Sequence, residues 1–156
     1  MTPRLLLLFL LALIPLAIIL VMRAPVEPVS NDAATGTFAD GFLEHLETVQ
    51  EAAGALVDLG ERRERNLLVV GQRQSSMNAA LDATDAWLAQ QAAHQGDPAV
   101  AAYRAGAAGI RQAMADAQAA FLRFDWDGIA AANDTLKQGA ADISTAQDLL
   151  HAADGT

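Results

Sequence analysis

The chain has 156 residues, a formal net charge of −9 and no cysteine. This length corresponds to one domain, and the lack of thiols excludes disulfides, thiolate metal sites and cysteine nucleophiles. The negative charge argues against nucleic-acid binding, which needs basic side chains to neutralise phosphates. Apolar residues make up 53% of the sequence and aromatic residues only 5%, and the abundance of alanine favours closely packed helices.

The N-terminus contains an uncharged apolar segment, residues 5–22, between Arg4 and Arg23. As a helix it would rise about 27 Å, close to the ~30 Å hydrocarbon core of a bilayer. We therefore predict a single transmembrane signal-anchor helix within residues 1–23, with lipid contacts along residues 5–22. The residues expected to form this membrane anchor are Leu5, Leu8, Phe9, Leu13, Ile18 and Leu20.

A cleaved signal peptide is the alternative for this segment. Its apolar core would be longer than the 7–15 residues that are typical of signal peptides. A cut at Ala24 would also have the large Met22 at position −3 and Pro25 directly after the cut, both of which disfavour cleavage. These features favour an anchor that is retained.

The charges around the anchor predict its orientation. Arg4 and the terminal amine precede it, whereas acidic residues soon follow Arg23, so the N-terminus is expected in the cytoplasm. Residues 24–36 contain prolines and small polar residues without periodicity, which is typical of a flexible linker. Residues 37–156 then form a periplasmic or otherwise extracytoplasmic domain.

A heptad pattern runs through residues 37–95, with apolar positions alternately four and three residues apart. Gly60, Arg63, Gln74 and Thr84 also fall on this seam and interrupt its apolar character. The predicted interaction seam comprises Phe42, Leu46, Val49, Leu56, Leu67, Val70, Leu81 and Leu88.

Two later breaks divide the rest of the chain into helices. Gly96 is expected to end one helix in the left-handed conformation, and Asp97 to cap the next, in which Pro98 suits the first turn. Asp125 is expected to cap the last helix. In that helix Asp127 is well placed for the helix dipole.

Residues 37–95 fit two architectures. A turn between Gly60 and Asn66 would give an antiparallel four-helix bundle, with the charged run 61–65 in the solvated turn. An unbroken helix would be about 88 Å long, and its first half would need a partner chain. Heptad continuity favours the second architecture, whereas Arg63 on the seam and equal helix lengths favour the first. We predict an all-α fold with the four-helix bundle, the alternative being one long helix plus a helical hairpin.

The sequence lacks the common catalytic motifs, including G-x-S-x-G, H-E-x-x-H and Gly-rich phosphate loops. We therefore expect a protein that is not an enzyme and holds no cofactor. Gln74 and Thr84 on the seam could mark a polar ligand pocket, although a buried polar residue more often fixes register.

Three histidines, His45, His94 and His151, fall near helix ends that an up-and-down bundle brings together. Three imidazoles could bind a transition metal, and two could ligate haem. The last two helices resemble cytochrome b562, a periplasmic four-helix haem protein. The resemblance implies haem between His45 and His151, although that family has methionine early in its first helix and no anchor. We favour ordinary surface or boundary histidines.

The expected function is that of a membrane-anchored accessory or structural subunit, or an assembly factor, of a larger membrane protein complex. It would act through helix–helix interactions with other membrane subunits, and a homo-oligomer is a further option. The alternatives are an extracytoplasmic ligand-binding or sensor bundle and a haem- or metal-binding bundle.

Overall fold

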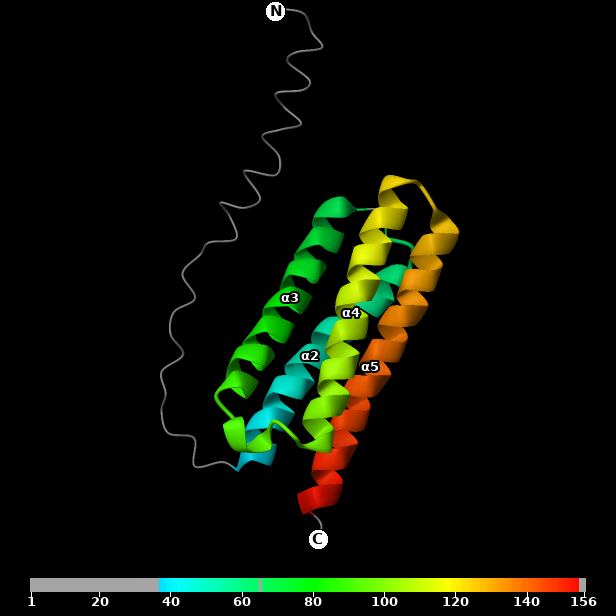
Figure 1. The fold of residues 1–156 in the computed structure, drawn as a ribbon. Helices are drawn as coiled ribbons and strands as arrows, with labels where there is room; N and C mark the ends of the chain where they lie inside the picture. Colours follow the sequence, from blue (N-terminus) through cyan, green and yellow to red (C-terminus); the bar gives the residue numbers. More distant parts are fainter. Residues whose placement is uncertain (1–36, 65, 155–156) are drawn as a thin grey trace, which may run out of the picture. The chain divides into compact units, whose positions relative to one another are not determined.

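The computed structural model describes residues 37–64 and 66–154. These residues form four α-helices: α2 (Phe38–Glu61), α3 (Leu67–Ala89), α4 (Pro98–Leu122) and α5 (Trp126–Asp154). A short 3-10 helix, η1 (Ala92–His94), joins α3 to α4. The helices run alternately up and down (Figure 1). The predicted helical bundle is therefore confirmed, with two helices rather than one in residues 37–95.

The predicted membrane anchor and linker, residues 1–36, lie outside the described residues. Among the helices that the structure describes, none is both long enough and apolar enough to span a bilayer. The anchor therefore stays a prediction from the sequence.

We call one end of the bundle the proximal end and the other the distal end. The proximal end contains the beginning of α2, the 3-10 helix η1 and the C-terminal part of α5. The distal end contains the α2–α3 turn (residues 62–64 and 66) and the α4–α5 turn (residues 123–125), as Figure 1 shows.

Side-chain caps fix where the helices begin. Thr37 and Asp40 form a reciprocal capping box at α2, and Asn66 Oδ1 accepts a hydrogen bond of 3.1 Å from Leu68 N at α3. The predicted caps at α4 and α5 are confirmed. Asp97 accepts from Ala99 N at 2.9 Å, and Asp125 accepts from Gly128 N at 2.9 Å. Each such cap stabilises its helix by about 1 kcal/mol.

Both distal turns contain a non-glycine residue in the left-handed conformation. Arg63 has φ 52° and Phe124 has φ 56°, and no described glycine has a positive φ. The expectation for Gly96 is therefore wrong. In each turn the two residues after the C-cap donate backbone hydrogen bonds to the preceding helical turn, which is the pattern that usually uses glycine. A side chain in this conformation costs about 1–2 kcal/mol.

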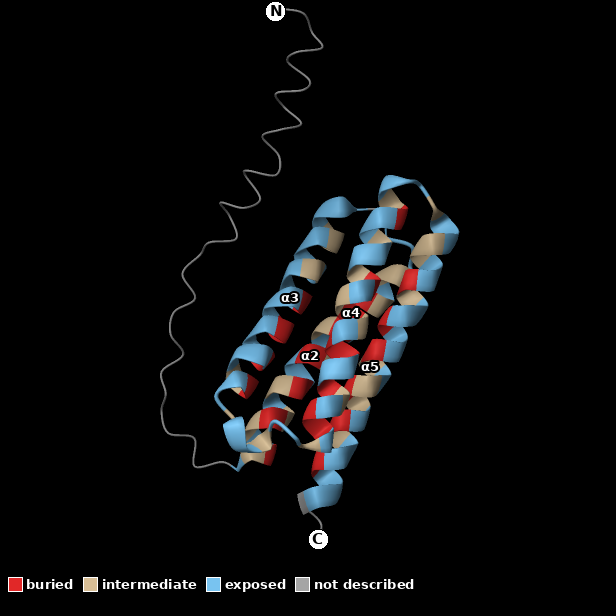
Figure 2. Ribbon diagram, in the orientation of Figure 1, coloured by how far each residue is buried: buried red, intermediate tan, exposed pale blue. Residues whose placement is uncertain are grey.

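The core is densest toward the proximal end. Six of the eight predicted seam residues are buried there or along α2, namely Phe42, Leu46, Val49, Leu56, Leu81 and Leu88. The other two depart from the prediction, since Val70 is half-buried and Leu67 is 61% exposed. Residues 67–76, the first half of α3, include no buried residue, and Figure 2 shows buried positions only farther along this helix.

Glycines bring α5 close to two other helices. A Cβ atom on Gly139 of α5 would lie 2.9 Å from the carbonyl oxygen of Gly106 in α4. A Cβ atom on Gly60, near the end of α2, would lie 2.4 Å from Asn133 Oδ1 in α5. Lys137 Nζ also pairs with Glu61 Oε1 at 2.9 Å. The end of α2 is therefore drawn toward α5, and the beginning of α3 receives little cover.

Candidate functional site: an open groove between α3 and α4

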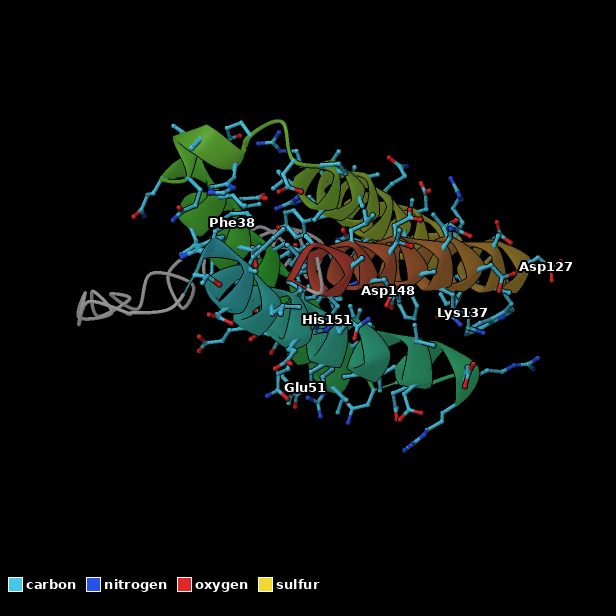
Figure 3. The ribbon with its side chains drawn as sticks, turned by 90° about the horizontal axis from the view of Figure 1, so that it is seen from below. Phe38, Glu51, Asp127, Lys137, Asp148 and His151 are labelled. Atoms are coloured by element: carbon cyan, nitrogen blue, oxygen red, sulfur yellow. The ribbon has the colours of Figure 1, made fainter. Side chains whose placement is uncertain are left out.

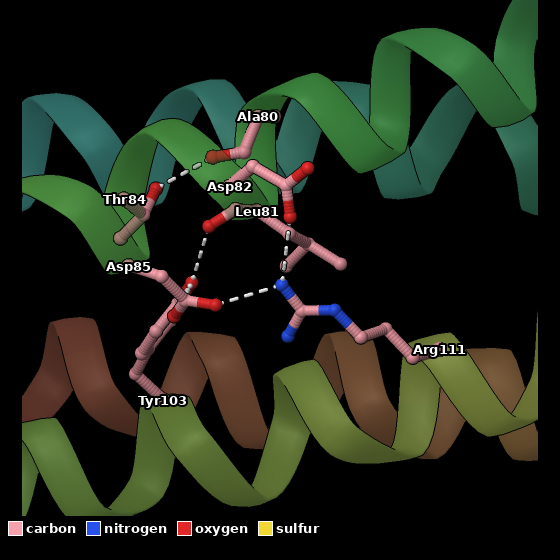
Figure 4. A network of polar contacts seen from close by, with 7 residues as sticks. All are labelled: Ala80, Leu81, Asp82, Thr84, Asp85, Tyr103 and Arg111. Carbon is pink, nitrogen blue, oxygen red and sulfur yellow. Dashed lines mark hydrogen bonds and ion pairs between the residues drawn. The ribbon is translucent and has the colours of Figure 1, made fainter. Parts of the chain in front are cut away.

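The seam between α3 and α4 is held together by side chains that reach across it (Figure 4). The Tyr103 hydroxyl lies 2.9 Å from Asp85 Oδ1 and 3.1 Å from the Leu81 carbonyl oxygen. Arg111 Nη2 lies 2.7 Å from Asp85 Oδ2 and 3.2 Å from Asp82 Oδ1. Two residues of α4 thus clamp one stretch of α3.

The environment keeps both residues of α4 in one protonation state. Burial, followed by the hydrogen bond to Asp85, raises the pKa of the Tyr103 hydroxyl well above its usual value, so it remains a donor. Burial alone would lower the pKa of Arg111, but its hydrogen bonds to Asp85 and Asp82 outweigh this and raise it. The bridge is therefore a neutral phenol beside a permanent cation and two carboxylates.

Two open recesses lie on either side of this bridge, and Arg111 lines both. The larger, of about 500 Å³, lies toward the proximal end, and the smaller, of about 200 Å³, lies toward the distal end. Together they form a groove along the α3–α4 seam. The larger recess is lined mainly by Asp85, Leu88, Gln95, Arg104, Ala107 and Arg111. The smaller is lined by Gln74, Asn78, Arg111, Met114, Ala115 and Gln118.

Gln95 fixes the proximal end of the groove. Its Nε2 donates to the Leu88 carbonyl oxygen at 2.6 Å, and its Oε1 accepts a hydrogen bond from Arg104. The connection between α3 and α4 is thereby tied to both helices, and the Arg104 guanidinium is held at the rim.

The two polar seam residues singled out in the sequence have different roles. Gln74 is half-buried and lines the smaller recess. Thr84 is fully buried, but its hydroxyl donates to the Ala80 carbonyl oxygen of the same helix at 2.8 Å. Only Gln74 is therefore available to a bound partner or ligand.

The histidines lie near the proximal end, which Figure 3 shows from below with Phe38 and His151 labelled. The His94 ring stacks on the Phe38 ring at a centroid distance of 3.8 Å. The centroid of the His45 ring lies 5.1 Å from that of the Trp87 ring. Burial lowers the pKa of His45, and the neighbouring Glu44 opposes this in part. His151 is exposed on α5.

The nearest ring neighbours of His45 and His94 are thus aromatic side chains. Within residues 37–64 and 66–154, no group of three His, Cys, Asp or Glu side chains is placed to hold a metal ion. The haem and metal sites stay alternatives that the sequence raised, and the groove is the better-defined site.

The groove residues were not singled out as a site from the sequence, apart from Gln74. Asp82 and Asp85 stand three residues apart on α3, and Tyr103 and Arg111 stand eight apart on α4, so each pair shares a helix face. This spacing indicates from the sequence that the members of each pair lie on the same face of their helix. It does not indicate which other helix that face contacts, because this depends on the topology of the bundle.

Comparisons with known proteins find no matching family, no matching curated protein and no matching solved structure. Function is therefore inferred from the geometry of the chain itself.

Proposed function

We propose that the protein is a membrane-anchored accessory or structural subunit, or an assembly factor, of a larger membrane protein complex. It would bind its partner through helix–helix packing in the α3–α4 groove. The observation that carries the proposal is that this seam is open, whereas glycines let α4 and α5 approach within van der Waals contact.

The lining of the groove suits a helix. Small side chains such as Ala107 and Ala115 let another backbone come close, and Met114 adapts its shape to an irregular partner. Amide side chains at the distal recess, including Gln74 and Asn78, can donate and accept hydrogen bonds at the rim. Binding of an amphipathic helix in a groove is a common recognition mode.

The N-terminal sequence supports a membrane partner. The apolar segment 5–22 would localise the chain, and the thirteen residues 24–36 would tether the bundle near the bilayer surface. A subunit that is confined in this way meets other membrane proteins at high effective concentration.

The test is purification of the full-length chain from its native membrane in mild detergent. We expect it to elute with a larger assembly. Ala108→Phe, which fills the groove, should release the chain, whereas Ala141→Phe on the exposed face of α5 should not. A wild-type chain that elutes alone, or an assembly that is indifferent to Ala108→Phe, would contradict the proposal.

A ligand-binding or sensor bundle is the second candidate, favoured by the charges at the larger recess. Its volume of about 500 Å³ is in the range of small-molecule sites, and Arg104 and Arg111 both border it. Because Arg111 is paired with Asp85 and Asp82 whereas Arg104 contacts the neutral Gln95, Arg104 is the cation that suits a small carboxylate. Such a ligand should raise the melting temperature of the wild type more than that of Arg104→Gln. If a panel of small carboxylates leaves both unchanged, this candidate is excluded.

A further inference from the structure

Exposed large hydrophobic side chains gather at the distal end of the bundle. Among the described residues, six large hydrophobic side chains are at least 38% exposed, and five of them lie near the two distal turns. The sixth, Leu149, lies near the other end of α5. We name the five the distal patch: Leu67 (61% exposed), Leu68 (70%), Leu122 (74%), Phe124 (75%) and Trp126 (51%).

The distal patch is large enough to form the core of an interface. With about 150–250 Å² for each large side chain, the exposed fractions leave roughly 600 Å² of mostly apolar surface. A stable interface buries about 800 Å² on each partner. Exposed charged side chains of both signs, Arg63, Arg123 and Asp127, lie in or next to the same two turns. A mixed rim of this kind can complement a second copy of itself.

The α2–α3 turn differs from the other two connections. The α3–α4 connection contains Gly96 and leads into Pro98, the first residue of α4, and the α4–α5 turn leads into the Asp125 cap. By contrast, residues 61–65 are Glu-Arg-Arg-Glu-Arg, all of which favour helix. As at Phe124 in the α4–α5 turn, the chain reverses through a positive φ, here 52° at Arg63, which strains an L-residue. This turn is therefore the connection most easily converted into helix.

The heptad pattern continues through the same turn without a change of phase. A turn between separate helices has no reason to preserve the register, whereas a continuous helix does. The positions on either side of the turn follow the four-three alternation: Leu56, Gly60, Arg63, Leu67 and Val70.

We propose that two copies of the chain exchange α2 and form a dimer through their distal ends. In each copy the α2–α3 turn straightens, so that residues 38–89 become one helix about 78 Å long. The α2 of one copy then packs on α3 and α5 of the other. The two distal patches meet at the centre of the dimer and cover each other.

The exchange preserves the contacts of each bundle. The α2 contacts, such as the Gln50–Ser144 hydrogen bond, pass between chains, whereas the α3–α4 bridge stays within one chain. The groove proposed above is therefore unchanged, and this inference does not depend on it. The closed turn is stabilised by the Asn66 cap. Because the exchanged state joins two chains, the balance between the two states depends on protein concentration.

A cross-linking experiment on the full-length chain tests the exchange directly. Because the chain has no cysteine, Gln50→Cys with Ser144→Cys introduces a single reactive pair. A short bis-maleimide should join two chains of the detergent-solubilised dimer through this pair. The control pair, Gln95→Cys with Arg104→Cys, should cross-link within one chain in either state.

Substitutions in the turn should shift the dimer in opposite directions. Arg63→Gly relieves the strain of the closed turn and weakens a continuous helix. Because both turns of the dimer carry the change, the dissociation constant of the dimer should increase on the order of a hundredfold. Asn66→Ala removes the α3 cap and should strengthen the dimer on the order of tenfold. Both effects are measured by light scattering over a concentration series.

Substitutions in the distal patch test the interface. Phe124→Gly should weaken the dimer without lowering the melting temperature, because glycine accepts φ 56° without strain. Leu149→Ser, outside the patch, should leave the dimer unchanged. Three outcomes would overturn the proposal: a chain that stays monomeric, a dimer cross-linked only within chains at positions 50 and 144, and a monomer whose patch instead binds phosphatidylcholine vesicles.

Discussion

The proximal and distal halves of the bundle share the same helices and the same heptad pattern, yet they differ in burial. Toward the proximal end, Phe42, Leu81 and Tyr103 are fully buried against one another's helices. Toward the distal end, Leu67 and Leu68 stand in solvent on the same helix as Leu81. The end of α2 packs against Asn133 and Lys137 of α5, which leaves the start of α3 uncovered. An apolar periodicity thus indicates which face of a helix can be buried, and the packing of the neighbouring helices determines whether that face is buried.

The largest expected difference between the halves concerns two leucines of α3. Leu81→Ala should lower the free energy of unfolding by about 2–5 kcal/mol, because it leaves a cavity in a closed core. Leu68→Ala, the same change on the exposed side, should alter it by less than about 0.5 kcal/mol. Urea unfolding followed by circular dichroism measures both. Equal losses would show that the distal half is as well packed as the proximal half.

Two glycines allow a closely packed helix surface to be compared with one that has no neighbouring atoms. Gly139→Ala should destabilise the fold by about 1–3 kcal/mol, because the added methyl meets the backbone of α4. Gly71→Ala should stabilise it by about 0.5–1 kcal/mol, since nothing lies within 4 Å of the new atom and alanine favours helix. Thermal unfolding of both variants distinguishes them by sign. A neutral Gly139→Ala would mean that α4 and α5 separate readily.

The Tyr103 bridge gives a smaller effect with its own pH signature. Tyr103→Phe should cost about 1 kcal/mol at neutral pH through the lost hydrogen bonds. The raised pKa means that the unfolded chain releases this proton near pH 10 while the folded chain retains it, so wild-type stability should fall above pH 10. The variant should lose less stability over that range. Parallel pH dependences in urea unfolding would show that the hydroxyl is not held in its protonated form.

Substitution of His45 should have the smallest effect on stability, and this effect should appear at acidic pH. Burial against Trp87 lowers its pKa, so the unfolded chain takes up a proton below pH 6.5 before the folded chain does. The stabilising contribution is present above pH 6.5 and is lost as the pH falls through the folded pKa. His45→Gln should reduce the loss of melting temperature between pH 7 and pH 5. His151→Gln, at an exposed site, is the control.

Local features of the bundle were predictable because they depend on neighbouring residues alone. Asp97 and Asp125 cap their helices as expected, since a short acceptor before a helix meets free amides wherever the helix packs. The left-handed positions were predicted less well. Gly96 does not use its conformational freedom, whereas Arg63 and Phe124 adopt the strained conformation because their turns must close.

The candidate site was largely hidden from the sequence. Gln74 was identified from its place on the seam, but the bridge of Tyr103, Asp85 and Arg111 joins residues 18 to 26 positions apart. No short-range pattern states which helices face each other across such a separation. The same holds for the histidines, for which the sequence offered a shared site and the structure gives His45 and His94 aromatic neighbours.

By itself, the sequence determined that the described domain is helical, where its connections after residue 95 lie and that most of the seam residues, six of the eight predicted, would be buried. These properties follow from helix propensity, capping and period, which act within a few residues. Only the tertiary structure decided that residues 37–95 turn back on themselves, that the α3–α4 seam stays open and that Leu67 and Phe124 face solvent. Those outcomes depend on how closely α5 approaches α2 and α4, and that approach is set by packing between segments distant in the chain.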